Sequence, residues 1–496
     1  MNWNAPAPLD QTLFDPLSVF NAGLYNHHIA NTAYPIGHLT TMRPYRIPRS
    51  EVQSFAPLAW EGIERLGLYV HIPFCEKRCG FCEYTVLDPA HNAENEDLYF
   101  DLLLLEFDLY RQALGAQCKT LIGFDIGGGT PSAAKTDNIA RVLEAARQTF
   151  NLPETVRISI ETTPKIAASQ PEKMRDYYKM GIRRISMGIQ TINPKLLEEI
   201  GRTATSVIYN QQAVENIRLA GFQRFNIDIM YGFANQSLNS LAATLQHVID
   251  LNPEYITLYR TRYKGTRLAA QAQWVTLEEV NAQAALAKER LLAAGYFATP
   301  GKNTFSRLRG EPGTSDYLTE RVVHGTPYLG LGLGAQSLSE VTLAYNSGAA
   351  DKRLQHYQRQ VEAGELPIQD LYYLSRAAAM GKMISVSFYF GEINLASFQQ
   401  KFSLRLEEAF PVEVAFLLEN DLMAYSDGEG RTLRLTSLGE KNYNGVIALF
   451  YAGAVKAHLL EMAASESAII PARVVSEKMN PLILHSVQDK FLANLR

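Results

Sequence analysis

Three cysteines in one short loop constrain this chain more than any other feature of its sequence. Cys75, Cys79 and Cys82 follow the apolar run 66–70 with the spacing C-x3-C-x2-C, and the 496 residues contain only four cysteines. A closed zinc site takes four ligands, usually from paired C-x2-C units. A [4Fe–4S] cube also takes four ligands, so three cysteines leave one iron open to a small molecule. The spacing therefore favours an iron–sulfur cluster with an open iron.

The alternative is a structural zinc site with a fourth ligand elsewhere, such as His71 or Cys118. Cys118 stands alone in Gly-Ala-Gln-Cys-Lys, and we interpret it as a spare thiol. So few cysteines in a chain of this length do not make a disulfide framework. A reducing cytoplasm suits this content, and a low-potential cluster with an open iron requires it. We therefore predict a cytoplasmic protein.

The bulk composition is that of an ordinary globular protein, with 47% hydrophobic and 20% charged residues. The net charge of -4 and the pI of about 6.2 suggest neither a nucleic-acid partner nor an anionic membrane partner. No apolar run reaches the roughly 18 residues that a membrane span needs. The first residues lack the basic and apolar regions of a secretory signal.

Between residue 66 and about residue 296, apolar segments of strand length alternate with segments of helical period. The expected strands cover 66–72, 120–126, 156–161, 184–187, 224–230 and 255–259. The expected helices cover 98–114, 137–150, 171–180, 206–220, 238–251 and 277–294. Six strands alternating with helices indicate parallel βα units, whose ligand loops lie at the carboxyl ends of the strands. We predict an α/β fold built on a partial (β/α)6 barrel.

A glycine-rich turn follows the second expected strand. It reads Gly127-Gly128-Gly129-Thr130-Pro131. Consecutive glycines let backbone N–H groups approach a ligand closely and can form an anion- or carboxylate-binding concavity. A tight βα turn explains such a triplet equally well. Its position, one βα unit after the cysteine loop, favours a ligand contact.

Polar side chains also follow the later strands. Glu161 ends the third strand, Gln190 and Arg202 follow the fourth, and Asp228 lies in the fifth. The carboxylates can accept hydrogen bonds from ribose hydroxyls, and the arginine can pair with a carboxylate. Together these groups suit a nucleoside with an amino-acid tail, although each residue alone would carry no such inference.

These motifs resemble the radical S-adenosylmethionine (SAM) superfamily, and within it the oxygen-independent coproporphyrinogen III oxidase-like family. The resemblance covers residues 66 to about 455. It rests on Leu-Tyr-Val-His-Ile-Pro-Phe-Cys, Gly-Gly-Gly-Thr-Pro, Ile-Ser-Met-Gly-Ile-Gln, Asp-Ile-Met-Tyr-Gly and Tyr-Leu-Gly-Leu-Gly-Leu-Gly-Ala. It implies that Cys75, Cys79 and Cys82 hold a [4Fe–4S] cluster whose open iron chelates SAM. An electron from the cluster then cleaves SAM to methionine and a 5′-deoxyadenosyl radical.

The resemblance also implies the SAM contacts. The positions that match the family's SAM site are Tyr69, Gly128, Glu161, Gln190, Arg202 and Asp228. The oxidase binds a second SAM near the cluster loop, at the positions that match Phe81, Gly129 and Thr130. We therefore expect two SAM molecules. A small-molecule substrate and a low-potential electron donor, such as flavodoxin or ferredoxin, complete the expected partners.

Two departures from the family pattern bear on the reaction. The oxidase has a further cysteine two residues after its third ligand, where this chain has Tyr84. The heme-chaperone branch usually carries a His-Asn and Tyr-Trp element before the Tyr-Leu-Gly-Leu-Gly segment, and residues 315–324 lack it. A third branch, the class C methyltransferases and cyclopropane-forming enzymes, tolerates such departures. We therefore expect carbon methylation or cyclopropanation of an unsaturated small molecule, with Glu83 and Tyr84 as candidates by position for proton transfer.

Two other functions stay open. One is oxidative decarboxylation or another modification of a tetrapyrrole, and the other is a heme carrier that keeps the cluster without substrate turnover. Fold-level analogy does not choose between these functions.

The C-terminal part changes pattern from about residue 366. Expected helices at 370–383, 395–402 and 412–419 precede a hairpin signal around Asp427 and Gly428. This order predicts a winged-helix-like module that covers the barrel mouth; without a basic recognition helix we do not expect it to bind DNA. The predicted domains are an irregular N-terminal arm (1–65), the barrel and its extension (66–365), the winged-helix-like domain (366–460) and a tail (461–496).

Overall fold

The computed structural model describes residues 12–25, 34–115, 119–426 and 431–467. The chain divides into two compact units. The barrel unit comprises Arg46–Arg321 and Thr326–Tyr373, and the second unit comprises the described parts of Met1–Tyr45, Val322–Gly325 and Leu374–Arg496. The predicted domain boundaries at residues 65, 365 and 460 stay predictions.

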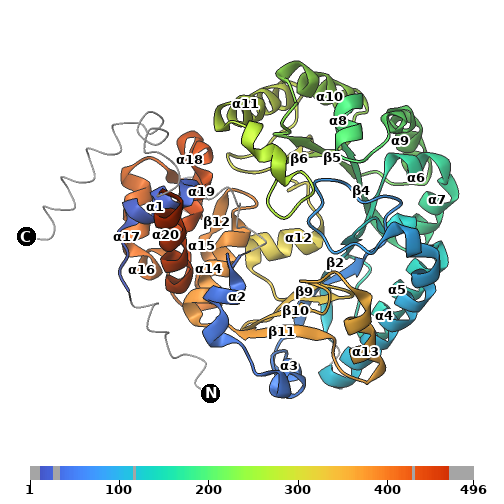
Figure 1. The fold of residues 1–496 in the computed structure, drawn as a ribbon, viewed down its shortest axis with the longest axis horizontal. Coiled ribbons are helices and arrows are strands. Elements are labelled where there is room, and N and C mark those ends of the chain that lie inside the picture. Colours follow the sequence, from blue (N-terminus) through green and yellow to red (C-terminus); the bar gives the residue numbers. More distant parts are fainter. Residues whose placement is uncertain (1–11, 26–33, 116–118, 427–430, 468–496) are drawn as a thin grey trace, which may run out of the picture. The chain divides into compact units, whose positions relative to one another are not determined.

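One sheet of eleven strands forms the barrel unit, in the order β11-β10-β9-β8-β1-β2-β3-β4-β5-β6-β7 (Figure 1). The strands β1 to β6 run parallel to one another, and β8 pairs with β1 in parallel. The six are β1 (Arg65–Ile72), β2 (Thr120–Gly128), β3 (Ile158–Thr162), β4 (Ile182–Gln190), β5 (Phe225–Tyr231) and β6 (Tyr255–Arg260). The expected α/β fold with parallel strands is confirmed, and all six strands occur where the sequence predicts them.

Antiparallel strands extend both edges of this parallel sheet. β7 (Thr304–Ser306) pairs with β6, while β9 (Gln336–Leu338) joins β8 (Tyr328–Leu331) to β10 (Thr342–Asn346). β11 (Ile368–Tyr373) pairs antiparallel with β10 at the far edge.

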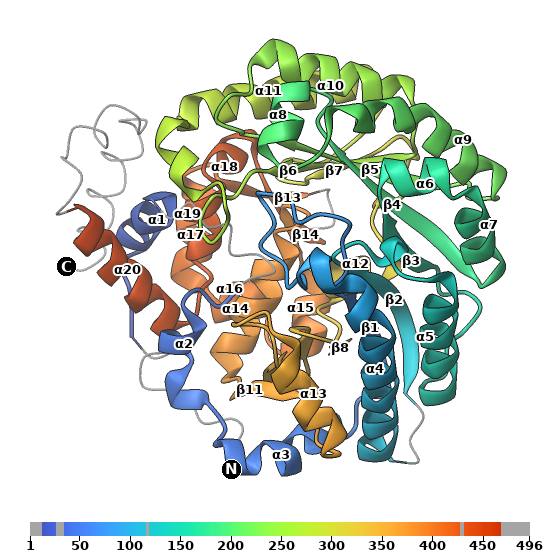
Figure 2. The same ribbon diagram turned by 45° about the vertical axis from the view of Figure 1, so that its right-hand side comes forward.

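Helices cover the outer face of the barrel sheet, and Figure 2 shows α4 and α5 running alongside β1 and β2. The crossover helices are α4 (Asn92–Leu114), α5 (Thr136–Thr149), α6 (Pro164–Ser169), α7 (Pro171–Lys179), α8 (Pro194–Glu199), α9 (Asn210–Leu219), α10 (Leu238–Asp250) and α11 (Leu277–Ala293). The parallel strands are apolar along most of their length because helices cover one face and the barrel interior the other. In β1, for example, Leu66, Leu68, Val70 and Ile72 are all fully buried.

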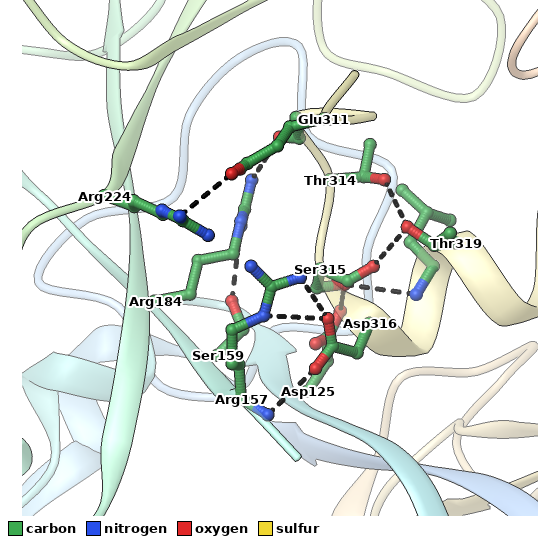
Figure 3. A network of polar contacts seen from close by, with 12 residues as sticks. Asp125, Arg157, Ser159, Arg184, Arg224, Glu311, Thr314, Ser315, Asp316 and Thr319 are labelled. Carbon is green, nitrogen blue, oxygen red and sulfur yellow. Dashed lines mark hydrogen bonds and ion pairs between the residues drawn. The ribbon is translucent and has the colours of Figure 1, made fainter. Parts of the chain in front are cut away.

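A polar network closes the end of the barrel where the strands begin (Figure 3). Arg157, just before β3, donates to Asp316 on the short helix α12 (Asp316–Thr319) at 2.5 Å, and Ser315 caps this helix. The Ser315 hydroxyl also donates to Asp125 in β2 at 2.6 Å. Arg224, just before β5, pairs with Glu311 at 2.9 Å. The amino ends of the strands are therefore occupied by protein, which leaves their carboxyl ends for ligands.

The second unit contains a three-stranded antiparallel sheet in the order β12-β14-β13, formed by β12 (Glu392–Asn394), β13 (Met423–Ser426) and β14 (Thr432–Leu435). Between β12 and β13 lie α15 (Leu395–Phe402), α16 (Leu406–Ala409) and α17 (Pro411–Glu419). The chain thus contains the helices and the hairpin that the sequence predicts, although the hairpin turn at 427–430 lies outside the described residues. Three further helices follow: α18 (Ser437–Lys441), α19 (Tyr443–Ala448) and α20 (Gly453–Ser467).

Two expectations for secondary structure need correction. The helix expected at 370–383 begins later, as α14 (Arg376–Ser387), and residues 368–373 form β11 instead. Ser375 fixes the start of α14 because its hydroxyl accepts a hydrogen bond from Ala378 N. The N-terminal stretch expected to be irregular contains α1 (Pro16–Tyr25) and α3 (Val52–Leu58). Within the described residues, no helix is both long and apolar enough to cross a membrane.

The carboxylate of Glu106 on α4 is completely buried and ties the barrel to its antiparallel extension. It accepts hydrogen bonds from Gly332 N (2.7 Å), Asn346 Nδ2 (2.8 Å) and Tyr357 Oη (2.6 Å), the last on α13 (Leu354–Glu362). Burial raises the pKa of Glu106 to about 7, although all three hydrogen bonds oppose this rise.

This buried acid predicts a pH dependence of stability. Between pH 4.5, the ordinary pKa of glutamate, and pH 7 the folded state keeps a proton on Glu106 that the unfolded state loses. Unfolding therefore releases a proton, and the unfolding free energy falls as the pH rises, by on the order of 3 kcal/mol for this residue. Denaturant titrations of Glu106→Gln should show a flatter pH profile than wild type over this range. Exposed Glu144→Gln is the matched control, and identical profiles for Glu106→Gln and wild type would contradict the assignment.

Candidate functional site

The cysteine loop leaves the carboxyl end of β1 and turns back before α4. Cys75, Cys79 and Cys82 are half-buried free thiols. The Thr130 hydroxyl lies 3.6 Å from Cys75 Sγ, and Arg202 Nε donates to Cys79 Sγ at 3.5 Å. The loop is anchored to the scaffold as well, because Asn92 Nδ2 donates to Cys75 O at 2.8 Å.

A structural zinc site at this loop would need a fourth ligand. Within the described residues, no group of three His, Cys, Asp or Glu side chains converges tightly enough to hold one metal ion. His71 is engaged at both ring nitrogens, with Thr85 O at 2.6 Å and Tyr69 Oη at 3.3 Å, and Cys118 lies outside the described residues. The zinc alternative therefore lacks a fourth ligand among the residues that the structure describes.

Burial disfavours the thiolate form of two of the three cysteines. Burial raises the pKa of Cys75 to about 12 and also raises the pKa of Cys82. Ligation by iron needs thiolates, so a bound cation must offset this cost. Arg202, which donates a hydrogen bond to Cys79 Sγ, already places one positive charge beside a sulfur atom of the loop.

The glycine turn after β2 packs directly against the cysteine loop. Gly129 N donates to Ile72 O at 2.8 Å and Thr130 N donates to Phe74 O at 2.7 Å. Gly128 has φ of 119°, a conformation that favours glycine, and a Cβ on it would lie 2.7 Å from the His71 ring. The triplet is therefore needed for close packing between the turn and the cysteine loop, in addition to any contact with a ligand.

Glu161 lies at the end of β3, beside the glycine turn. A Cβ on Gly127 would lie 3.0 Å from both Glu161 Oε1 and the Tyr69 ring, so these two side chains flank the same turn. Glu161 keeps solvent-accessible surface, yet protein atoms surround it closely enough to desolvate the carboxylate. Desolvation, with the neighbouring carboxylates of Asp228 and Asp125, raises the pKa of Glu161 to about 8. This carboxyl group is suited to hydrogen bonding with a neutral polar ligand such as a ribose.

Side chains of β4 and β5 hold the carboxylate of Asp228, which lies in β5. It accepts hydrogen bonds from Ser186 Oγ (3.1 Å) and from Asn226 Nδ2 (2.6 Å), and Thr257 Oγ1 in turn donates to Asn226 Oδ1 (2.9 Å). Burial raises the pKa of Asp228. The hydrogen bonds fix the orientation of the carboxylate before any ligand arrives.

Gln190 is the most unusual residue of the site. It ends β4 with φ of 68°, which a non-glycine residue adopts rarely and which is a common feature of functional sites. Its Oε1 is buried without a hydrogen-bond partner in the described structure. Arg202, whose guanidinium donates to Gly188 O, lies over the same end of β4. An unpaired buried acceptor beside an arginine is the geometry expected where a polar ligand completes the hydrogen bonds.

The remaining predicted residues lie around this cluster of side chains. Phe81 packs against Phe233, with ring centroids 6.4 Å apart. Tyr84 is 65% exposed, and Glu83 pairs with Arg262 at 3.6 Å. The structure thus gathers the cysteine loop, the glycine turn and the polar residues that end the strands at the carboxyl end of the sheet. The roles assigned to them stay predictions.

Several residues that shape the site escaped the sequence analysis. Asn92 anchors the cysteine loop, Asn226 and Ser186 orient Asp228, and the charge of Asp125 helps to raise the pKa of Glu161. Asp125 Oδ1 is buried and unpaired in the described structure. The polar positions within the apolar strands β2, β4 and β5 were the available signal, because such positions need partners inside a barrel. No signal marked Asn92, which lies at the start of a helix.

Comparison with known proteins agrees with this site. Residues 69–248 match the model of the Radical SAM superfamily. A heme chaperone HemW from Buchnera aphidicola is 36% identical over 200 residues, which cover 39% of this chain and 50% of the relative. Its Escherichia coli counterpart is 26% identical over 336 residues, 63% of this chain and 82% of the relative. The chain spans about half the length of the first curated relatives it matches.

The structure of coproporphyrinogen III oxidase from Escherichia coli, described as a radical SAM enzyme, superposes with a TM-score of 0.69. It is 23% identical, and the match covers 84% of this chain and 96% of the oxidase. The fold and the cysteine loop define a radical SAM protein. Residues 69–248 form a radical SAM domain, and the relatives and the fold support the coproporphyrinogen III oxidase-like family that the sequence motifs predict.

Proposed function

We propose that this protein binds a [4Fe–4S] cluster through Cys75, Cys79 and Cys82 and cleaves SAM reductively beside it. The position of three half-buried cysteines in one loop, packed directly against the glycine turn, carries the proposal. When bound, the cluster and SAM supply one-electron chemistry that splits a carbon–sulfur bond of SAM.

The chain's own residues bind and orient SAM in this proposal. Glu161 and Asp228 accept from its hydroxyl groups, Gln190 supplies an unpaired acceptor, and Arg202 pairs with its carboxylate. Tyr69 and Gly128 complete the set of residues that contact SAM in this proposal. The carboxylate of Asp228 is already oriented by Ser186 and Asn226, so little order is lost when ligand binds.

The proposal also includes a second SAM, bound at Phe81, Gly129 and Thr130. The amides of Gly129 and Thr130 already donate to Ile72 O and Phe74 O. The Thr130 hydroxyl and the Phe81 ring are the groups that this position offers a second SAM. Methyl transfer or cyclopropanation depends on this second molecule, and neither the HemW relatives nor the oxidase is named for such a reaction.

The substrate class that the comparisons favour is a tetrapyrrole. The curated relatives carry the name heme chaperone, and the oxidase of similar fold is named for coproporphyrinogen III. We therefore place tetrapyrrole modification or heme binding ahead of methyl transfer, which reverses the order expected from the sequence. A low-potential donor such as flavodoxin or ferredoxin supplies the electron in this proposal.

One anaerobic assay tests the proposal. The protein with reconstituted cluster is mixed with reductant and SAM, and 5′-deoxyadenosine and S-adenosylhomocysteine are quantified. We expect 5′-deoxyadenosine at several times the level of a cluster-free control. Its absence, while a known radical SAM enzyme is active in the same mixture, would overturn SAM cleavage. S-adenosylhomocysteine that depends on substrate would favour methyl transfer, and a heme Soret band without 5′-deoxyadenosine would favour the carrier.

A further inference from the structure

Each sulfur atom of the cysteine loop has a hydrogen-bonding partner. The pairs are Thr130 Oγ1 with Cys75, Arg202 Nε with Cys79, and the backbone N–H of Tyr84 with Cys82. The first pair is separated by 3.6 Å and the second by 3.5 Å. A hydroxyl, a guanidinium and an amide are all able to donate to a sulfur that is bound to iron, so the loop carries a donor for each of its three sulfur atoms.

Arg202 is the donor of these three that carries a full positive charge. A hydrogen bond from a charged donor is stronger than one between neutral groups. The charge also acts on a second cysteine. Burial raises the pKa of Cys75 to about 12, and the hydrogen bond with Thr130 and the charge of Arg202 oppose this rise. Arg202 therefore favours the anionic form of sulfur at Cys75 as well as at Cys79.

The fold fixes the position of Arg202 beside the cysteine loop. The end of α8 is tied to this loop, because Gly80 N donates to Ile200 O at 2.8 Å. Gly201 follows with φ of 80°, a conformation that favours glycine, and so turns the chain sharply before Arg202. The guanidinium also donates to Gly188 O in β4. Arg202 is thus held from both the helix and the strand, and its contact with sulfur is built into the scaffold.

Other positive charges lie near the loop and act on it differently. Burial raises the pKa of Cys82, and the charges of Arg78 and Lys352 are among the influences that oppose this rise. Lys352 Nζ donates to the backbone oxygen of Glu83 at 2.8 Å, so its charge reaches the sulfur through space. Lys352 therefore offers a comparison with Arg202, which donates to sulfur directly.

We propose that Arg202 raises the reduction potential of the cluster through its hydrogen bond to Cys79 Sγ, with a smaller contribution from Thr130 at Cys75. The inference rests on the proposed function, because it concerns the cluster that these cysteines hold in that proposal. Reduction transfers one electron from the low-potential donor to the cluster and adds one negative charge to it. A donor on a ligand sulfur stabilises this more negative form, and hydrogen bonds to sulfur are one of the factors that set the potential of such clusters.

The test is an anaerobic redox titration of the reconstituted protein without SAM, followed by the electron paramagnetic resonance signal of the reduced cluster. Arg202→Met should lower the equilibrium constant for reduction about tenfold, which is ~59 mV for a one-electron couple. Thr130→Val, which removes a neutral donor, should lower this constant about threefold.

Two variants serve as controls. Lys352→Met removes a positive charge near the same loop and leaves the hydrogen bonds to sulfur in place, so the potential should fall by less than half as much as in Arg202→Met. Arg290→Met removes a positive charge from the exposed surface of α11 and should leave the potential unchanged.

Two results would overturn the inference. One is a wild-type potential in Arg202→Met, and the other is an equal fall in Arg202→Met and Lys352→Met, which would assign the effect to charge at a distance. The midpoint potential does not depend on the fraction of protein that carries a cluster, so partial loading of a variant does not obscure the result. Because the titration contains no SAM, absence of SAM cleavage contradicts the proposed function alone, whereas a wild-type protein that binds no cluster contradicts both.

Discussion

Replacing Cys75, Cys79 or Cys82 with alanine should abolish the brown chromophore of the reconstituted protein near ~400 nm and reduce 5′-deoxyadenosine formation to background. Each thiol is expected to hold a different iron of the cube, so two thiols do not retain the cluster. Absorbance, iron content and 5′-deoxyadenosine are measured together. The spare thiol Cys118 provides the control, because Cys118→Ala should leave all three readings unchanged. A full chromophore in all three single variants would remove the basis for the cluster.

The cysteine variants should still fold, which makes their loss of chromophore interpretable. The three thiols lie in a loop and are only half-buried, whereas the apolar side chains of β1 before it are fully buried. Stability therefore comes mainly from the strand and its helices. Circular dichroism and thermal unfolding should match the wild-type apoprotein closely. A collapse of secondary structure in one variant would mean that its thiol has a structural role.

Gly129→Ala should disrupt the site without touching a ligand-binding side chain. A Cβ at this position would lie 2.6 Å from Phe74 O, closer than real Cβ atoms approach another atom, and 3.1 Å from Cys75 Sγ, which is an unusually tight contact. Because Phe74 O is backbone that also accepts from Thr130 N, the clash cannot be relieved by a side-chain rotation. The cysteine loop or the glycine turn must move, and we expect poor cluster loading and SAM binding weakened at least about tenfold, which is ~1.4 kcal/mol.

The control for Gly129→Ala is a glycine substitution without a clash. Gly364 has φ of 75° and no atom within 4 Å of its hypothetical Cβ. Gly364→Ala should therefore cost about 1–2 kcal/mol of stability through backbone strain alone and leave cluster content unchanged. Iron content, SAM binding by calorimetry and thermal unfolding separate the two effects. Wild-type loading and affinity in Gly129→Ala would show that the close packing of the turn is not required.

Much of the barrel follows from local pattern. Apolar runs of five to nine residues identify β1 to β6, because a parallel strand covered on both faces has few polar positions. The local pattern failed at the start of 370–383, where it predicted a helix over residues that belong to β11. The polar and aromatic residues there resemble a helix in sequence, but Asp370 pairs with Arg46 and the strand is completed by β10, whose sequence lies more than twenty residues earlier.

The site could be predicted only in part, for a physical reason. Residues with a role in one motif, such as the cysteines or the glycine triplet, are visible because the chemistry demands several of them at fixed spacing. Asn92 and Asp125 act through partners that are distant in sequence, and nothing in their local sequence indicates those partners. The same holds for Lys352, which reaches Glu83 across 269 positions.

The sequence alone determined that three thiols occur at a spacing suited to a cube with an open iron, and that parallel strands follow. Those properties depend on residue type and short-range spacing, which the chain carries directly. Only the tertiary structure decided that Arg202 reaches Cys79, that Gln190 presents an unpaired buried oxygen, and that Lys352 and Arg262 meet at Glu83. These contacts arise when parallel strands bring their carboxyl ends to one edge, because that packing joins segments that are far apart in the sequence.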